Sequence, residues 1–308
     1  MAFLQAFGSY VPERRVTNEE IARMAGCEPA WISRVCGIEE RRWAAAGESV
    51  ADMAVRAGED CLARAGVGPA GLGMLIVACG TPERQFPGPA STVARHLGLD
   101  PAPALDLPMA SAGSLFGLAL AAGLAAHHGP ILVVGVEKMS EVVLRTPLDR
   151  NVAVLFGDGA GACLVSPDHG ARILDWAIHS DGAFADELSL DYGAPLAMNG
   201  LAVILQASRK LPRVIETLLE RNGRTVADVD AFLLHQANRN LLGKVARALK
   251  APVERFPTNI ARYGNTSSAS LLIAADEWSR QTPPPPGALV VLAAFGAGLH
   301  WGAVLAEY

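Results

Sequence analysis

The chain has 308 residues, of which 51% are apolar and 19% charged, so it can bury a large core and is not a disordered tail protein. Its formal net charge is −5 and it contains no basic run, which excludes the electrostatic footprint of a nucleic-acid-binding protein. The five cysteines are an odd set without CxxC or metal-ligand spacing, which favours a reducing compartment over a disulfide scaffold and predicts no metal site.

The N-terminal residues Met1–Arg15 lack the basic stretch followed by an apolar stretch that marks a signal peptide. Residues 107–136 carry no formal charge, and on length alone they would cross a bilayer. Pro108, Ser111 and the sequence His127-His128-Gly129-Pro130 divide this segment, so we expect a buried helix followed by a buried strand. We therefore predict a cytoplasmic protein without a membrane span.

In the first half of the chain, short apolar runs alternate with helical segments. Gly73–Cys79 and Ile131–Val134 have the composition of buried strands. Ala104–Leu107 precedes a helix that we expect to begin at Ser111. This alternation predicts a mainly parallel sheet covered by helices.

The second half repeats three of these elements in the same order and at a nearly constant offset of 156 to 158 residues. The matching pairs are Leu75–Val77 with Phe232–Leu234, Ser111–Phe116 with Ser267–Leu272, and Ile131–Val134 with Leu289–Leu292. Unrelated α/β segments also look alike, but three elements in one order at one offset favour a duplication. We interpret residues 1–168 and 169–308 as the two halves of a duplicated α/β unit.

A duplication of this kind brings equivalent turns together, so we expect a site where the turn at Ser111 meets loops of the second half. His235 follows a buried strand, where α/β folds place functional groups, although a hydrogen-bonded core histidine is the plainer interpretation. Asn265, before the next helix, is either a helix cap or a neutral donor to an enolate oxygen. The turn Phe295–Gly298 could offer an N–H to an oxyanion.

Further motifs run in one order from about residue 4 to the C-terminus: Gly8–Pro12, Trp31-Ile32, Gly37–Arg41, Asp149-Arg150, Phe156–Gly161, His235–Asn238, Gly264–Ser267, Ala294–Gly298 and Trp301-Gly302. The Phe156–Gly161 motif lacks the GxGxxG spacing of a dinucleotide site. Together the motifs resemble the β-ketoacyl-ACP synthase III family. The resemblance implies the thiolase fold, with two α/β halves in five α-β-α-β-α layers.

The resemblance also implies an acyltransferase of fatty acid or polyketide biosynthesis. Such an enzyme loads an acyl group from acyl-CoA or an acyl-carrier protein and condenses it with a malonyl thioester. It needs no cofactor beyond the CoA or phosphopantetheine of its substrates. By position, His235 and Asn265 are the pair that holds the thioester oxygen during decarboxylation. The backbone N–H groups of Ser111 and Ala297 would form the oxyanion hole, with Ala297 in place of the family's glycine.

The nucleophile position departs from the family pattern. The motif D-x-x-x-x-C-x-G reads Asp106 to Gly113 here, with Ser111 in the cysteine position. A hydroxyl is a weaker nucleophile than a thiol unless a base activates it. Three interpretations stay open: a natural serine-dependent acyltransferase or synthase, a malonyl decarboxylase without condensation, or an engineered cysteine-to-serine variant.

Four residues carry the substrate and partner contacts that the resemblance implies. Trp31 and Arg150 match positions around the CoA adenine, and Asn238 lies in the tunnel motif. Two tunnel arginines of the family are displaced by one residue here, which favours a carrier protein over free CoA as the donor. Phe86 matches a residue that closes the partner subunit's acyl pocket, which implies a homodimer, although a packed loop aromatic would look the same.

A different class of function also stays in view. A non-catalytic subunit with this fold could dimerise with a partner synthase and stabilise it. The presence of both His235 and Asn265 argues against that alternative, because a structural subunit does not need a decarboxylation pair.

Overall fold

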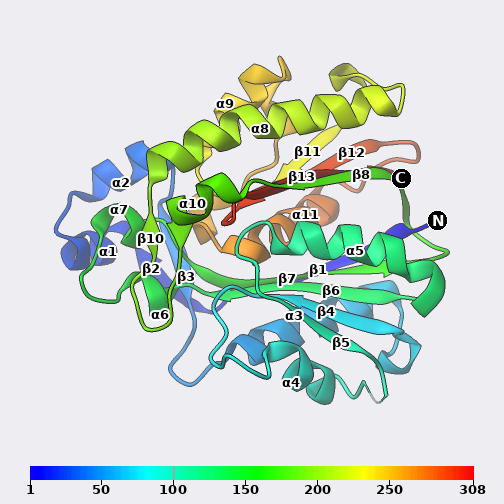
Figure 1. Ribbon diagram of the computed structural model, residues 1–308, viewed down its shortest axis with the longest axis horizontal. Coiled ribbons are helices and arrows are strands. Elements are labelled where there is room, and N and C mark those ends of the chain that lie inside the picture. The colour runs from blue at the N-terminus through cyan, green and yellow to red at the C-terminus, as the bar shows by residue number, and fades with distance from the viewer. Residues whose placement is uncertain (100) are drawn as a thin grey trace.

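The computed structural model describes residues 1–99 and 101–308, and it shows a layered arrangement of helices and sheets (Figure 1). The first half forms a sheet in the order β1, β7, β6, β4, β5. Its strands are β1 (Phe3–Tyr10), β4 (Met74–Ala78), β5 (Ala104–Leu107), β6 (Ile131–Lys138) and β7 (Asp158–Ser166). β4 and β6 are parallel and buried along their whole length, as apolar runs covered on both faces should be.

The second half builds the same arrangement in the order β8, β13, β12, β11. Its strands are β8 (Ala171–Ser180), β11 (Ala231–Leu234), β12 (Leu289–Gly296) and β13 (His300–Glu307). β11 pairs with β12 in parallel, and β12 pairs with β13 antiparallel. In the first half β4 likewise pairs with β6 in parallel, and β6 pairs with β7 antiparallel. The duplication predicted from the sequence offsets is thus visible in strand order and direction, and the predicted boundary at residue 168 falls in the turn between β7 and β8.

Helices form the other three layers (Figure 1). The central pair, α5 (Gly113–His128) and α11 (Ser270–Gln281), lies between the two halves of the sheet. α3 (Val50–Ala65) and α4 (Pro89–His96) cover the outer face of the first half, and α8 (Gly200–Arg221) and α9 (Arg239–Ala248) cover that of the second. The predicted five α-β-α-β-α layers are therefore present.

The remaining elements are short, and most of them gather at one end of the layers (Figure 1). They are β2 (Arg14–Thr17), α1 (Asn18–Ala25), α2 (Pro29–Cys36), β3 (Glu40–Trp43), α6 (Ser140–Val143), α7 (Arg150–Ala153), β9 (Leu188–Ser189), β10 (Ala197–Met198) and α10 (Ile260–Tyr263). Among the described residues, no helix has both the length and the apolar character that a membrane crossing requires.

The two central helices begin later than their sequences predict. α5 starts at Gly113 rather than Ser111, because Ser111 has φ 62° and a right-handed helix needs a negative φ. α11 starts at Ser270, after a 3-10 turn over Ser267–Ala269 that separates it from Asn265, and ends at Gln281. Ser267 has φ 48°, so it also lies outside the helix that follows it. Both helices are thus preceded by a serine in the left-handed conformation.

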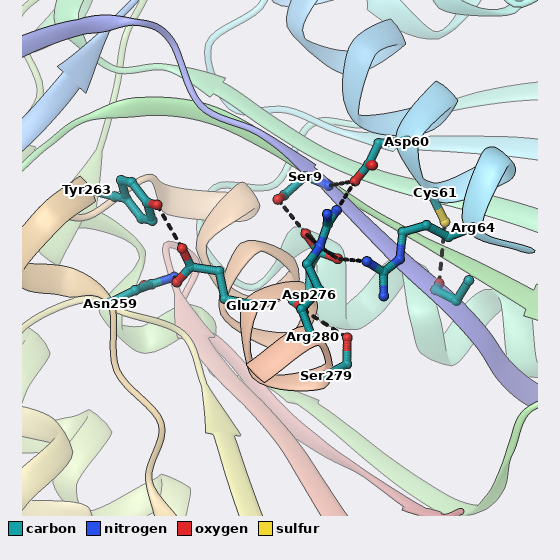
Figure 2. A network of polar contacts seen from close by, with 11 residues as sticks. Ser9, Asp60, Cys61, Arg64, Asn259, Tyr263, Asp276, Glu277, Ser279 and Arg280 are labelled. Carbon is teal, nitrogen blue, oxygen red and sulfur yellow. Dashed lines mark hydrogen bonds and ion pairs between the residues drawn. The ribbon is translucent and has the colours of Figure 1, made fainter. Parts of the chain in front are cut away.

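A buried ionic cluster fixes α11 against the first half (Figure 2). Asp276 on α11 is 1% exposed; its carboxylate accepts the Ser9 hydroxyl of β1 at 2.6 Å and the Arg280 Nε–H at 2.9 Å. Arg280 pairs in addition with Asp60 on α3, and Asp60 accepts the Ser9 N–H at 3.0 Å. A buried carboxylate needs such partners to offset its lost hydration. The cluster therefore holds α11, and the Ser267–Ala269 turn before it, in place.

Candidate active site

Two turns, one from each half, meet between the sheets. Ser111 precedes α5 and Ser267 precedes α11, and each is in the left-handed backbone region, which costs a non-glycine residue about 1–2 kcal/mol. The Ser111 N–H donates to Ser267 Oγ at 2.9 Å, and the two hydroxyl oxygens are 3.4 Å apart. The two serines occupy equivalent positions 156 residues apart, so the duplication itself places them against each other.

A cavity of about 700 Å³ opens beside this junction, and its wall brings together most of the predicted site residues. They are Ser111, His235, Asn265, Ala297, Trp31 and Asn238. Much of the remaining wall is apolar and comes from the β9–β10 segment and α8, with Leu188, Leu190, Leu196, Met198, Leu201, Val203, Ile204, Ala207 and Leu211. A mostly apolar cavity with a few convergent polar groups is the usual form of a small-molecule site.

His235 follows β11 directly and is buried. Its Nδ1 shares a hydrogen bond with Ser270 Oγ, which also accepts the Gln236 N–H at 3.1 Å. Ser270 Oγ keeps its own hydrogen, which it can donate to Nδ1, and in that tautomer the ring N–H is on Nε2. Burial lowers the pKa of His235 to about 4, so the ring is neutral at pH 7. A neutral ring of this tautomer is a hydrogen-bond donor without charge.

Asn265 is fixed in the turn before α11 by bonds from its own side chain and backbone. Its Oδ1 accepts the Ser267 N–H at 2.9 Å, and its backbone N–H donates to Leu155 O at 2.9 Å. The oxygen of the amide thus stabilises the turn, as a capping role would require, while the Nδ2 amino group remains for a ligand in the cavity. α11 itself has no side-chain cap, since Ala269 occupies its N-cap position.

The predicted oxyanion donors differ in their surroundings. Ala297 lies in the turn between β12 and β13 and lines the cavity. Gly296 beside it passes so close to the Ser111 turn that a Cβ there would be 2.3 Å from Ala110 O. The Ser111 N–H is bonded to Ser267 Oγ, so it can serve an oxyanion only when that bond is given up.

The predicted substrate contacts are distributed around the cavity. The Arg150 guanidinium carbon lies 5.7 Å from the centre of the half-buried Trp31 ring, within cation–π distance. Asn238 lines the cavity, but its Oδ1 accepts the Asn240 N–H and its Nδ2 donates to Val35 O, so its polar atoms serve the start of α9. Phe86 lies outside the cavity wall and is 84% exposed.

Sequence reasoning missed Glu137, a fully buried carboxylate at the end of β6. Its Oε1 accepts the Ser267 hydroxyl at 3.0 Å and lies 2.9 Å from Ser268 Oγ, whose one hydrogen is shared with Met109 O at 2.7 Å. Its Oε2 accepts the Thr81 hydroxyl at 2.7 Å and the Gly80 N–H at 3.0 Å. Burial raises the pKa of Glu137, while these hydrogen bonds act in the opposite direction. The available signal was one acidic residue closing an apolar strand, where α/β folds gather functional groups.

Comparison with known proteins identifies families and relatives to which the chain is similar. Residues 105–182 match the model for 3-oxoacyl-acyl-carrier-protein (ACP) synthase III, and residues 219–308 match the model for its C-terminal part. A β-ketoacyl-acyl-carrier-protein synthase III from a Nostoc species is 35% identical over 98% of this chain and 96% of its own length. An acetoacetyl-CoA synthase from a Streptomyces species is 36% identical over 98% of this chain and 97% of its own.

Solved structures of related proteins also resemble the structure of this chain. The crystal structure of 3-oxoacyl-acyl-carrier-protein synthase III from Aquifex aeolicus superposes with a TM-score of 0.96, at 32% identity over the whole of both chains. The predicted thiolase-type fold is thereby confirmed. The chain belongs to the β-ketoacyl-ACP synthase III family and is an acyltransferase of the condensing type.

The burial of a neutral His235 predicts a loss of stability in acid. Its pKa is about 4 in the folded state and 6.5 in the unfolded chain, so below pH 6.5 the unfolded state binds a proton that the folded state does not. The histidine's contribution to the free energy of unfolding therefore falls from pH 6.5 down to about pH 4. The difference between the parent and His235→Asn should change by up to about 3 kcal/mol over this range.

Urea denaturation of both proteins at a series of pH values measures this difference. Comparing the two cancels the opposite contributions of Glu137 and Asp158, whose pKa values burial raises. A difference that did not vary with pH would contradict a neutral buried ring.

Proposed function

We propose that this family member transfers an acyl group from a thioester to Ser111 Oγ and then condenses it with a malonyl thioester. The observation that carries the proposal is the meeting of Ser111, His235 and Asn265 on the wall of one large, mostly apolar cavity. Such a cavity suits an acyl chain and a pantetheine arm.

In the first half-reaction the Ser111 oxygen bonds to the thioester carbonyl carbon, and the carbon–sulfur bond breaks. The carbonyl oxygen carries the developing negative charge. Ser111 stands at the N-terminal end of α5, a 16-residue helix whose dipole favours that charge. The Ala297 N–H supports the same oxygen in this proposal, and the Ser111 N–H joins it after leaving Ser267 Oγ.

In the second half-reaction a malonyl thioester loses carbon dioxide, and the resulting enolate carbon attacks the acyl ester on Ser111. The enolate oxygen needs donors that do not protonate it. His235, neutral because burial lowers its pKa to about 4, and the Asn265 amide are donors of this kind. The bond between the acyl carbon and Ser111 Oγ then breaks, the oxygen takes up a proton to restore the hydroxyl, and the β-ketoacyl thioester is released.

The second candidate is a serine acyltransferase that passes the acyl group from Ser111 to another acceptor, with or without malonyl decarboxylation. The observation in its favour is Ser111 itself, because an oxygen ester is a less reactive acyl donor than a thioester. A non-catalytic partner subunit is less well supported, since both His235 and Asn265 line the cavity.

The donor is proposed to be acyl-CoA or an acyl-carrier protein. Trp31 lines the cavity with the Arg150 guanidinium 5.7 Å from its ring centre, a pair that suits an adenine ring and supports CoA, whereas the displaced tunnel arginines favour a carrier protein. The relatives are named for both kinds of substrate, the Nostoc protein for the carrier protein and the Streptomyces protein for CoA.

A homodimer is also proposed. β5 is the edge strand of the first half, and its Leu105 is 38% exposed. Phe86, 84% exposed, lies in the loop between β4 and α4. An unpaired edge with exposed apolar side chains is a template for pairing with a second chain. We expect sedimentation equilibrium to give twice the chain mass of 32.2 kDa; a monomer at micromolar concentration would count against the dimer.

Incubation with a panel of acyl-CoAs and acyl-carrier proteins tests the nucleophile. Intact mass should show one acyl adduct, and peptide mapping should place it on Ser111. Ser111→Ala should abolish the adduct. Cys79→Ala is the matched control, because burial raises the pKa of the Cys79 thiol well above its usual range and makes it a poor nucleophile. An adduct on Cys79 that persists in Ser111→Ala would refute the assignment.

Asn265→Ala tests the enolate site. Removal of one donor to a developing oxyanion costs about 10²–10³ in rate, so malonyl decarboxylation should slow by that factor. The release of carbon dioxide from a malonyl thioester measures this directly. Acylation of Ser111 in the same variant is the internal control for folding. Decarboxylation at the parental rate would show that the amide serves another purpose.

A further inference from the structure

A chain of three side-chain oxygens leads from the cavity into the core. Ser267 Oγ donates its hydrogen to Glu137 Oε1 at 3.0 Å, so it can only accept from Ser111. One of its lone pairs accepts the Ser111 N–H at 2.9 Å, and the other faces the Ser111 hydroxyl oxygen at 3.4 Å. All hydrogens along this chain therefore run in one direction, from Ser111 toward Glu137.

Glu137, at the far end of this hydrogen-bond chain, has the surroundings of a proton acceptor. The Gly80 N–H and the Thr81 and Ser267 hydroxyls all donate to the Glu137 carboxylate, and donors on both of its oxygens are the pattern of an ionised group. The adjacent Lys138 pairs with Glu141, and among the described residues no cation forms an ion pair with Glu137. No counter-ion therefore lowers the pKa of the carboxylate, and burial raises it in spite of the hydrogen bonds that act in the opposite direction.

His235 is the other base in the cavity, and its surroundings make it the weaker of the two. Burial favours the uncharged form of both groups, so it raises the pKa of Glu137 above its ordinary value and lowers that of His235 to about 4. The Nδ1 of His235 is held by Ser270, and no hydrogen bond within the described residues joins the His235 ring to the Ser111 hydroxyl.

We propose that Glu137 accepts the proton of the Ser111 hydroxyl through Ser267 during acylation. As the Ser111 oxygen bonds to the thioester carbon, its proton passes to Ser267 Oγ while the Ser267 proton passes to Glu137 Oε1. When the carbon–sulfur bond breaks, Glu137 returns the proton through Ser267 to the leaving sulfur, which departs as a thiol. This inference rests on the proposed function, because it requires Ser111 as the nucleophile.

Single-turnover acylation, followed by intact mass, tests the relay in two backgrounds. General base catalysis is typically worth 10²–10⁴ in rate, so Glu137→Gln should slow acylation of Ser111 by at least about 100-fold. In the Ser111→Cys background the same substitution should cost less than about tenfold, because a thiol with a pKa of about 8.5 ionises without an internal base. A purely structural role of Glu137 would slow both backgrounds equally.

Ser267→Ala provides a second route to the same conclusion, should Glu137→Gln not fold. Ser267→Ala interrupts the hydrogen-bond chain in the middle, so we expect it to slow acylation about as much as Glu137→Gln does. The double variant should be little slower than either single variant. Ser268→Ala is the matched control: the Ser268 hydroxyl lies 2.9 Å from the same Glu137 oxygen and is also bonded to Met109 O, but it has no hydrogen bond to Ser111. Its removal should therefore slow acylation clearly less than Ser267→Ala does.

The outcomes separate the inference from the function on which it rests. Equal losses in the serine and cysteine backgrounds would overturn the relay. So would an adduct that stays on Ser111 and forms at the parental rate in both Glu137→Gln and Ser267→Ala; the proposed nucleophile would then survive. Acylation that persists in Ser111→Ala would overturn both.

Discussion

The site depends on the contact between two turns that the duplicated halves bring to their common axis. Ser111 and Ser267 can approach because each adopts a left-handed conformation, and that strain is sustained by packing around them. A Cβ on Gly135 would lie 2.2 Å from Ser268 O, and one on Gly296 would lie 2.3 Å from Ala110 O. The junction therefore excludes any side chain at these two positions. The Asp276 cluster holds the second turn from behind, through α11.

Burial then sets the chemistry of the groups around this contact. Loss of hydration makes His235 a neutral donor and makes Glu137 a stronger base, because it penalises the charged form of each. It also raises the pKa of the Cys79 and Cys163 thiols well above their usual range, so neither is ionised near neutral pH. The surroundings thus suppress the thiols of the core, which supports the proposal that the Ser111 hydroxyl is the reactive group.

The sequence predicted those parts that local pattern determines. The apolar runs of β4, β6, β11 and β12 and their constant offset indicated the strands and the duplication. Their carboxyl ends indicated His235, while the resemblance supplied its role. The features that the sequence did not predict depend on contacts between distant residues. The late start of α5 follows from the strain at Ser111, and Glu137 acquires its importance only from Ser267, which lies 130 residues away in the sequence.

A buried anion beside the nucleophile suits a hydroxyl better than a thiolate. Burial raises the pKa of the Cys79 thiol, and the Glu137 charge raises it further, because the sulfur lies 4.0 Å from Oε2 and like charges repel. A thiolate at position 111 would meet the same repulsion, although more weakly, since Ser267 stands between. In the proposed relay a hydroxyl instead gives its proton to that carboxylate, so the negative charge is transferred rather than doubled. The hydrogen-bond chain from Ser111 to Glu137 is therefore matched to an oxygen nucleophile on electrostatic grounds.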